Sequence, residues 1–371
     1  MMRSDPMRHL SLREFDLPLL LVVLTITLLG ITTIYSASRQ SGLDAVKPYY
    51  LKQILWLMIA IVAMAALLLI DYHLFLAFSP VAYGGVVLLL IAVLLAGRTG
   101  RLGARRWIEI AGIGIQPSEL AKIAVVLMMA RYIDAVRARI RRFHFFILGL
   151  AIAGVVAVLI VVEPHLGNAA ILAPLAIAML YAGGCNRKHI VVMAIVGLAL
   201  SPVLWHNLTG YQKGRLLVFL HPESDPLGKG YQVIQSEIAV GSGGIVGKGW
   251  CEGTQSGLSF LPEQHTDFIF SVFAEERGFL GVLVLLLLYG FFIIRGLRIA
   301  AESKDFCGAL LCVGMVSLVG MQVIANIAMA IRLMPVTGLP LPFFSYGGSF
   351  LLTTMVAVGV LLNVRLRCRT F

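Results

Sequence analysis

The sequence predicts an all-α integral membrane protein with about ten transmembrane helices and one large extracytoplasmic loop between spans seven and eight. Of its 371 residues, 59% are hydrophobic and 13% are charged, and the mean hydropathy is +0.91. Soluble domains carry about 25% charged residues, so this composition excludes an ordinary soluble protein. Apolar runs of about twenty residues, the length that crosses a hydrocarbon core, recur along the chain.

The apolar runs give the predicted spans in order. They cover residues 17–36, 52–70, 74–96, 118–134, 144–162, 166–183, 189–206, 268–294, 306–330 and 343–364. The fourth run is short and polar at its start. Because no repeat and no second domain interrupts the series, we expect residues 1–371 to form a single polytopic membrane domain.

The placement of Arg and Lys predicts the orientation of the spans, because cytoplasmic connections carry an excess of both. An even number of spans returns the C-terminus to the side of the N-terminus, and both ends of the chain are basic. We therefore expect cytoplasmic termini. The cytoplasmic side then collects Arg3, Arg8, Arg13, Arg131, Arg137, Arg139, Arg141, Arg142, Arg187, Lys188, Arg295, Arg298, Lys304, Arg365, Arg367 and Arg369.

The formal net charge of +11 would suggest a nucleic-acid partner in a soluble protein. Here the basic residues are explained by the anchoring of cytoplasmic connections. No soluble basic domain is present to bind a polyanion, so we expect no nucleic acid.

The short connection between spans three and four is an exception, because it is outside and yet basic. It contains Arg98, Arg101, Arg105 and Arg106. This excess indicates either a bound anionic group or contact with lipid phosphates of the outer leaflet. Arg106 is followed by Trp107, an interfacial indole, and is the best candidate for a specific role.

One long connection, about residues 207–267, is predicted to be the extracytoplasmic loop. Its segment 231–240 is expected to form a short helix at the membrane surface. The string G-S-G-G-I-V-G-K-G-W, residues 241–250, does not fit a Walker A loop, because Gly249 follows the lysine. Two interpretations stay open: a flexible glycine-rich turn, or backbone amides that contact a diphosphate together with Lys248.

Asp267 stands where this polar loop meets the eighth span, in the string F-L-P-E-Q-H-T-D-F-I-F. An acid at a membrane edge costs free energy unless it is solvated, paired or used, so it is a candidate functional residue. Ser271 and Glu275 follow at four-residue steps and should face the protein interior. For Glu275 and Glu276 we expect a structural role at the start of the helix.

Glu263, His265 and Asp267 would share one face of an extended segment. Their spacing is a weak signal for zinc. A loosely held Mg²⁺ or Mn²⁺ that bridges carboxylate and diphosphate suits oxygen ligands better, although nothing in the sequence requires a cofactor.

Glu119 and Lys122 form a second polar pair, at the start of the fourth span after Gln116-Pro117-Ser118. At a spacing of three residues they can touch on one helix face. We expect a structural pairing near the outer surface, within reach of Asp267. The string P-L-P-F-F-S-Y-G-G-S, residues 340–349, predicts an irregular entry to the last span.

These segments together resemble the SEDS family (shape, elongation, division and sporulation) of bacterial cell-wall polymerases, and within it the elongation branch. The resemblance covers essentially the whole chain. It rests on G-A-R-R-W (103–107), Q-P-S-E-L-A-K (116–122), P-E-S-D-P-L-G-K-G-Y-Q (222–232), G-S-G-G-I-V-G-K-G-W (241–250), G-T-Q-S (253–256), L-P-E-Q-H-T-D-F (261–268) and S-Y-G-G-S (345–349).

The resemblance implies that Asp267 is the essential catalytic residue and that Glu119 and Lys122 form a structural salt bridge near the active cavity. Outer-face basic groups and the matching motifs supply candidates for substrate contact. These candidates are Arg106, Arg215, Lys248, His265, Thr266 and Ser345. The chain departs from the family where Q-P-D-L-G is usual, because it has Glu163 and His165 in the string E-P-H-L-G.

By the same resemblance, the chain is expected to polymerise lipid II into glycan strands during cell elongation, as a glycosyltransferase of the bacterial cytoplasmic membrane. Its active site would lie on the extracytoplasmic face. The implied partners are a class B penicillin-binding protein, the elongation machinery and membrane lipid. Two alternatives remain: a lipid II flippase, and a noncatalytic scaffold for a cell-wall transpeptidase. Because the polar residues gather on the outer side, we favour an enzyme.

Overall fold

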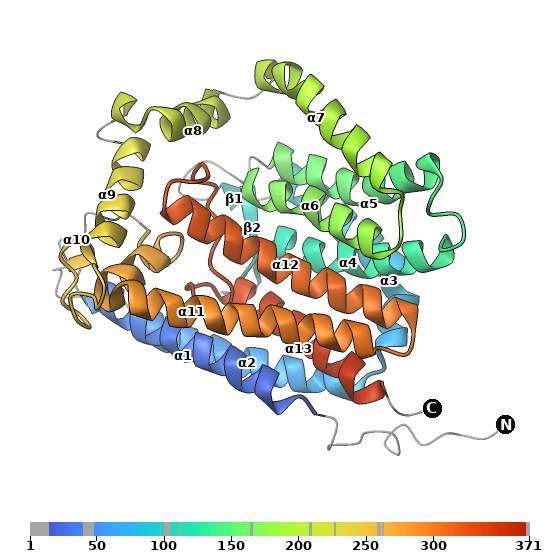
Figure 1. The fold of residues 1–371 in the computed structure, drawn as a ribbon, viewed down its shortest axis with the longest axis horizontal. Helices are drawn as coiled ribbons and strands as arrows, with labels where there is room; N and C mark the ends of the chain where they lie inside the picture. Colours follow the sequence, from blue (N-terminus) through green and yellow to red (C-terminus); the bar gives the residue numbers. More distant parts are fainter. Residues whose placement is uncertain are drawn as a thin grey trace.

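The computed structural model describes residues 15–39, 48–96, 98–99, 105–110, 113–163, 166–207, 210–225, 228–257, 261 and 263–368. It is a bundle of helices (Figure 1), which confirms the all-α class. A long helix coincides with each of the ten predicted runs. These helices are α1 (Leu17–Arg39), α2 (Tyr49–Leu69), α3 (Tyr72–Ala96), α4 (Pro117–Ala135), α5 (Phe143–Val162), α6 (Leu166–Ala182), α7 (Arg187–Asn207), α11 (Ile269–Glu302), α12 (Phe306–Ala330) and α13 (Gly348–Arg367).

The chain is an integral membrane protein. Among the described residues, seven helices are long and apolar enough to cross a membrane: α1, α2, α3, α5, α11, α12 and α13. Helix α6 is a shorter apolar helix. Helix α4 contains four charged residues, Glu119, Lys122, Arg131 and Asp134. The count of ten membrane crossings therefore stays a prediction.

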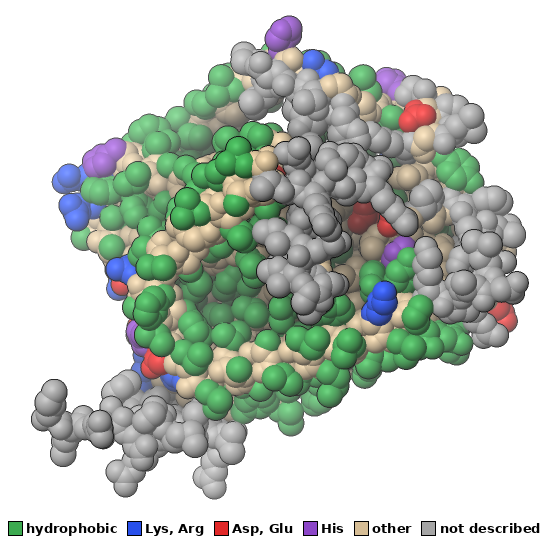
Figure 2. All heavy atoms as spheres, turned by 180° about the vertical axis from the view of Figure 1, so that it is seen from behind, with side chains coloured by type: hydrophobic (Ala, Val, Ile, Leu, Met, Phe, Trp, Pro, Cys, Tyr) green, Lys and Arg blue, Asp and Glu red, His purple; other side chains and the backbone are tan. Residues whose placement is uncertain are grey.

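Lipid-facing helices need apolar outer surfaces, and the bundle has them. Large hydrophobic side chains on α2, α3, α5, α7 and α11 are exposed, and they cover much of the surface in Figure 2. Inside the bundle, α13 packs on α2, and α11 packs on α12. Helices α12 and α13 are the most buried of the seven, so they form the centre on which the site is built.

Ion pairs join several helix ends at one end of the bundle. Asp16, just before α1, lies 2.8 Å from Arg295 near the end of α11. At the same end, Arg367 of α13 lies 3.6 Å from Asp71, between α2 and α3. The start of α1 and the end of α13 therefore lie together, as Figure 1 shows, which is the arrangement that an even number of spans requires.

The connection between α3 and α4 differs from the short loop that we expected. It contains a small antiparallel sheet of β1 (Arg98–Thr99), β2 (Arg105–Ile110) and β3 (Ile113–Ile115), in the order β1-β2-β3. Ile108 pairs with Ile115, and Ile110 pairs with Ile113. Strands of two to six residues are too short to stand out in a search for membrane-length apolar runs.

The long loop before α11 is largely helical. It contains α8 (Gly210–Leu220), a 3-10 turn η2 (Pro222–Ser224), α9 (Lys229–Ser242) and α10 (Thr254–Gly257). Helix α9 confirms the helix predicted over residues 231–240. Residues 263–268 then form consecutive turns that lead directly into α11.

Helix α11 is broken at Gly278, where φ is 62° and ψ is −166°. The segment 243–249 fills this break. Phe279 and Leu280 donate their backbone N–H groups to the carbonyls of Gly244 and Ile245, at 2.9 and 3.0 Å. In return, the carbonyls of Glu275 and Glu276 accept from Lys248 and Gly249, at 3.0 and 3.1 Å. The loop thus supplies hydrogen-bond partners for four of the backbone groups that flank the break.

Candidate active site

Asp267 lies in the turns before α11, at the opposite end of the bundle from the ion pairs of Asp16 and Asp71. Its amide donates to the carbonyl of Glu263 at 3.2 Å. The residue as a whole is partly exposed, and its carboxylate forms no hydrogen bond within the described part of the chain. The backbone of Gly338 lies beside it, because a Cβ on Gly338 would stand 3.4 Å from Oδ2. The backbone of Gly338 thus covers one side of the carboxylate.

The surroundings of Asp267 raise its pKa to about 6. Burial is the largest cause, because it disfavours the charged form, and the negative charge of Glu263 adds to it. The positive charge of Arg215, on α8, acts in the opposite direction and lowers the pKa. A carboxyl with this pKa is ionised at neutral pH and is a stronger base than an ordinary aspartate.

Two loops meet at the site and are fixed to each other by hydrogen bonds. The hydroxyl of Ser345 donates to the carbonyl of Thr266 at 2.7 Å and accepts from the amide of Leu341 at 2.8 Å. The amide of Tyr346 donates to the carbonyl of His265 at 3.0 Å. Ser345 is buried, so its hydroxyl joins the two loops. The predicted contact of Ser345 with substrate stays a prediction.

Gln53 of α2 extends this network. Its Nε2 donates to the carbonyl of Ser345 at 3.1 Å, and its Oε1 accepts from the amide of Gly347 at 3.1 Å. Because Gln53 is fully buried, both polar atoms of its side chain are used to hold the turn that precedes α13.

The side chain of His265 packs among aromatic rings. It stacks on Tyr49 with ring centroids 4.3 Å apart, and the ring of Tyr346 lies 5.7 Å from it. The neighbouring Thr266 donates from its hydroxyl to the carbonyl of Glu263 at 3.1 Å. Both residues thus lie beside Asp267, and both are partly exposed.

Asn326 of α12 reaches the backbone of Asp267. Its Nδ2 donates to the carbonyl of Asp267 at 2.9 Å and to the carbonyl of Leu339 at 2.7 Å. The residue is fully buried. Leu339 follows Gly338, so Asn326 connects Asp267 to the segment that walls its carboxylate.

The expected pair on α4 is present and buried. Lys122 Nζ lies 2.8 Å from Oε1 of Glu119. Asn168, near the start of α6, joins it: its Oδ1 accepts from Lys122 at 3.2 Å, and its Nδ2 donates to Glu119 at 3.1 Å. The next segment is close, because a Cβ on Gly167 would meet the carbonyl of Thr337 at 2.7 Å. The pair is therefore connected to the wall of the Asp267 site through residues 337–339.

The ammonium of Lys248 is bonded to other residues of the protein, whereas a diphosphate contact requires a cation that faces the substrate. Its Nζ lies 2.8 Å from Oε1 of the fully buried Glu275 and 2.7 Å from the hydroxyl of Thr254. The same carboxylate oxygen accepts from the amides of Thr254 and Gln255, at 2.7 and 2.9 Å. The amides of Lys248 and Gly249 are bonded to carbonyls of α11. Diphosphate contact through Lys248 stays a prediction that this arrangement does not favour.

The two acids on α11 are structural, but they lie beyond its first turn and bind neighbouring segments, so the expected role at the start of the helix is not what they have. Glu276 is buried, bonds to the hydroxyl of Ser36, and accepts from the amide of Cys251 at 3.2 Å. Ser271 is also buried, and its hydroxyl lies 2.7 Å from that of Ser236. The polar stripe after Asp267 therefore faces the protein interior, as predicted.

The structure thus brings together Asp267, His265, Thr266 and Ser345, with Arg215 close enough to act on the pKa of Asp267. The side chain of Arg106 lies outside the described residues, as does that of His165. Of Glu163, the structure shows a buried side chain. No group of three His, Cys, Asp or Glu side chains in the described ranges could hold a metal ion.

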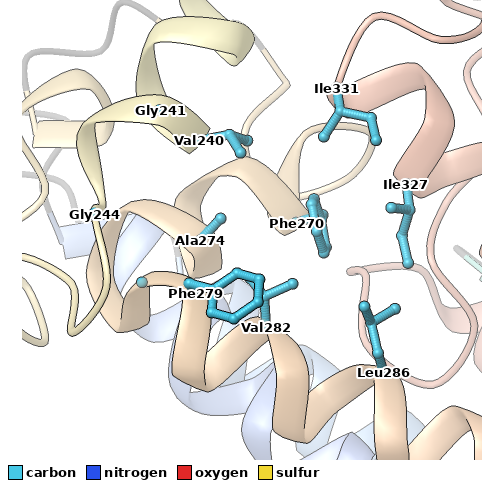
Figure 3. A pocket seen from close by; sticks show the side chains of 11 residues that line it. Val240, Gly241, Gly244, Phe270, Ala274, Phe279, Val282, Leu286, Ile327 and Ile331 are labelled. Carbon is cyan, nitrogen blue, oxygen red and sulfur yellow. The ribbon is translucent and has the colours of Figure 1, made fainter.

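An apolar cavity of about 300 Å³ lies between α9, α11 and α12 (Figure 3). Its lining includes Val240, Phe270, Phe279 and Ile327. Phe270, three residues after Asp267 in the sequence, is the lining residue nearest to Asp267 along the chain.

Sequence reasoning missed Asn326 and Gln53. Both are polar residues inside apolar runs, and such residues cost free energy in a membrane helix unless they are bonded. That signal was present in the sequence, but it does not say which groups the two amides contact.

Comparisons with known proteins show similarity over nearly the whole length of this chain. The model of a family of cell cycle proteins, FTSW_RODA_SPOVE, matches residues 16–370. The peptidoglycan glycosyltransferase MrdB of Escherichia coli is 39% identical over 355 residues, which is 95% of this chain and 93% of MrdB. A probable peptidoglycan glycosyltransferase FtsW of Geobacter metallireducens is 38% identical over 367 residues, or 97% and 96% of the two chains.

Solved structures show the same fold. A chain of a peptidoglycan synthase complex, described as coordinating polymerization and crosslinking, superposes with a TM-score of 0.80 and 34% identity, covering 96% of this chain and 98% of that chain. The rod shape determining protein RodA of Thermus thermophilus gives a TM-score of 0.70 and 29% identity, covering 95% and 96%.

Proposed function

Because the chain belongs to the FtsW, RodA and SpoVE family and is a RodA-type peptidoglycan glycosyltransferase of cell elongation, we propose that Asp267 is the general base of its reaction. The observation that carries this assignment is the environment of one carboxylate. It belongs to a partly exposed residue, lies beside Gly338, accepts no hydrogen bond from the described residues, and has a pKa raised to about 6 by burial.

The proposed substrate is lipid II, a disaccharide-pentapeptide linked to undecaprenyl diphosphate. The 4-hydroxyl of an acceptor sugar attacks the anomeric carbon of a donor sugar, and the bond from that carbon to the diphosphate breaks. Asp267 takes the hydroxyl proton as the new glycosidic bond forms. The diphosphate leaves as a stable anion, so a general acid is not required.

Positive charge near the leaving group would stabilise the transition state. Arg215 is the candidate that the structure favours, because its charge already acts on Asp267. Arg106 stays a candidate from the sequence. A divalent cation, Mg²⁺ or Mn²⁺, would have to be held mainly by the diphosphate, with Glu263 and Asp267 as nearby carboxylates. No step of the proposed reaction depends on it.

A lipid-linked substrate also needs an apolar surface next to the base. The cavity lined by Phe270, Phe279 and Ile327 is an apolar surface on α11, the helix that follows Asp267, and we assign it to the apolar chain. We further propose that the site faces the extracytoplasmic side, that both termini are cytoplasmic, and that the partner is a class B penicillin-binding protein. The relative in a complex of polymerization and crosslinking supports the last proposal.

The test is glycan synthesis from purified lipid II in detergent, where there are no two leaflets to move a lipid between. Wild type and Asp267→Asn are each assayed with the partner transpeptidase. We expect glycan strands from wild type and none from the folded variant. Equal synthesis by both would rule out Asp267 as the base. If neither makes polymer although both are folded and bind the partner, transport or scaffolding replaces the enzymatic assignment.

A further inference from the structure

Asn326 is a buried residue whose side-chain amide donates two hydrogen bonds to two different segments of the candidate active site. It lies one turn before the end of α12 and is fully buried. Its Nδ2 donates to the carbonyl of Asp267 at 2.9 Å and to the carbonyl of Leu339 at 2.7 Å. Asp267 and Leu339 are 72 positions apart in the sequence.

The chemistry of this contact requires an amide. Both acceptors are carbonyls, so the side chain must offer two N–H groups in one plane, which the NH₂ of Asn does. A Lys or Arg would also donate twice, but it would place a charge in a fully buried position at a cost of several kcal/mol. The Oδ1 atom is buried without a partner among the described residues. Nothing else in the described structure uses Asn326, so its local role is confined to these two carbonyls.

The two hydrogen bonds of Asn326 fix the position of the Asp267 carboxylate. Leu339 follows Gly338, whose backbone stands against Oδ2 of Asp267, as the 3.4 Å spacing of an added Cβ shows. Asn326 therefore fixes the main chain of Asp267 and the wall of its carboxylate relative to one another. The hydroxyl of Ser345 bonds to the carbonyl of Thr266, and the amide of Tyr346 bonds to the carbonyl of His265. The carbonyl of Asp267 itself is bonded by Asn326.

We propose that Asn326 is a positioning residue, which sets the place of the Asp267 carboxylate through the carbonyls of Asp267 and Leu339. This inference rests on the proposed role of Asp267 as the base. A misplacement of a reacting group by about 1 Å can lower a rate about 100-fold, so a tether of this kind has a measurable effect on catalysis. Asn326 touches no reacting atom and is not itself a catalytic residue.

The experiment compares Asn326→Leu, Asn326→Gln and Asn326→Asp in the full chain with the partner transpeptidase, using purified lipid II. Activity is normalised to folded protein that binds the partner. The matched control is Gln322→Leu, because Gln322 is a buried amide one turn earlier on α12 whose side chain forms no hydrogen bond with the described residues of the site. Asp267→Asn is measured in the same series.

For Asn326→Leu, which removes both donors, we expect kcat to fall by about 10- to 100-fold while KM changes by less than about threefold. Asn326→Gln keeps both donors on a longer stem and should recover part of the rate. Asn326→Asp replaces them with a carboxylate next to Asp267. Its negative charge should move the acid limb of the pH–rate profile to higher pH. Gln322→Leu should leave both kcat and the pH profile unchanged.

A purely structural role predicts a different result. Asn326→Leu would then yield less folded protein, but the folded fraction would keep the wild-type kcat, and Asn326→Asp, whose carboxylate lacks both donors, would keep the wild-type kcat on the plateau of its pH profile, where the positioning role predicts a lower one. Either of these two results overturns the inference, even if the yield of Asn326→Leu is too low to assay. Full activity of Asp267→Asn would instead overturn the proposed function, so the two failures can be told apart.

Discussion

Gly247 and Gly278 lie in direct backbone contact, because the segment 243–249 fills the break in α11. A Cβ on Gly278 would overlap the backbone nitrogen of Gly247, and a Cβ on Gly247 would overlap the carbonyl of Glu276. Gly278 has φ 62° and ψ −166°, a conformation that is essentially restricted to glycine. This crossing holds the part of α11 near Gly278 against the loop between α9 and α10.

Gly278→Ala should therefore destabilise the protein strongly. Backbone strain alone costs about 1–3 kcal/mol at such a conformation, and the overlap with Gly247 adds to it. Gly290→Ala on the same helix is the control, because a Cβ there has nothing within 4 Å. Thermal unfolding in detergent checks both variants. A Gly278→Ala protein as stable as the control would mean that the crossing does not exist.

The buried pair on α4 leads to a second prediction. Glu119→Gln leaves the Lys122 ammonium without its counter-charge 2.8 Å away, in a fully buried position. Breaking a buried pair in this way costs about 3–5 kcal/mol. The double variant Glu119→Gln with Lys122→Met leaves no uncompensated charge and should be more stable than Glu119→Gln alone. Thermal melts of the three proteins test this, and a double variant weaker than the single one would contradict it.

The ion pair of Lys248 and Glu275 leads to the prediction that Lys248 stabilises the fold and does not bind the substrate. Glu275 accepts from Lys248, Thr254 and Gln255, so Glu275→Ala should loosen residues 248–255 and lower the stability by about 3 kcal/mol or more. Lys248→Met removes the counter-charge of this buried carboxylate and should also lower the stability. We expect its KM for lipid II to stay within about threefold of wild type. An increase in KM of about tenfold or more, where tenfold equals 1.4 kcal/mol, would indicate that Lys248 contacts the substrate.

The helices were predictable because each is encoded by a local apolar run. Helix α12 was placed at its observed bounds, and α11 was placed at its start. The break at Gly278 was not predicted, because the partner that fills it comes from the loop 243–249. The same limit applies to Asn326: the sequence shows a polar residue in an apolar span, but its contact with Asp267 is 59 positions away.

The site was predictable in its centre and less so around it. Asp267 was singled out because an acid at a membrane edge needs a reason to be there, and the buried pair of Glu119 and Lys122 followed from helix spacing. Lys248 looked free in the sequence, since nothing local shows that its charge is bound to Glu275, 27 positions later. Charges that are committed to a buried partner cannot be told from free ones without the fold.

The most direct test of the account is the pH dependence of kcat/KM for lipid II polymerisation. Loss of activity in an Asp267 variant shows that the residue is essential, whereas the pH profile shows whether it acts as a base. Since the base must be ionised, kcat/KM should rise with pH through an apparent pKa of about 6 and then level off. Glu263→Gln removes a charge that raises this pKa, so the limb should move to lower pH. Arg215→Gln removes a charge that lowers it, so the limb should move to higher pH. A profile that is flat from about pH 5 to 8, or a limb that neither variant moves, would contradict the assignment of Asp267 as the base.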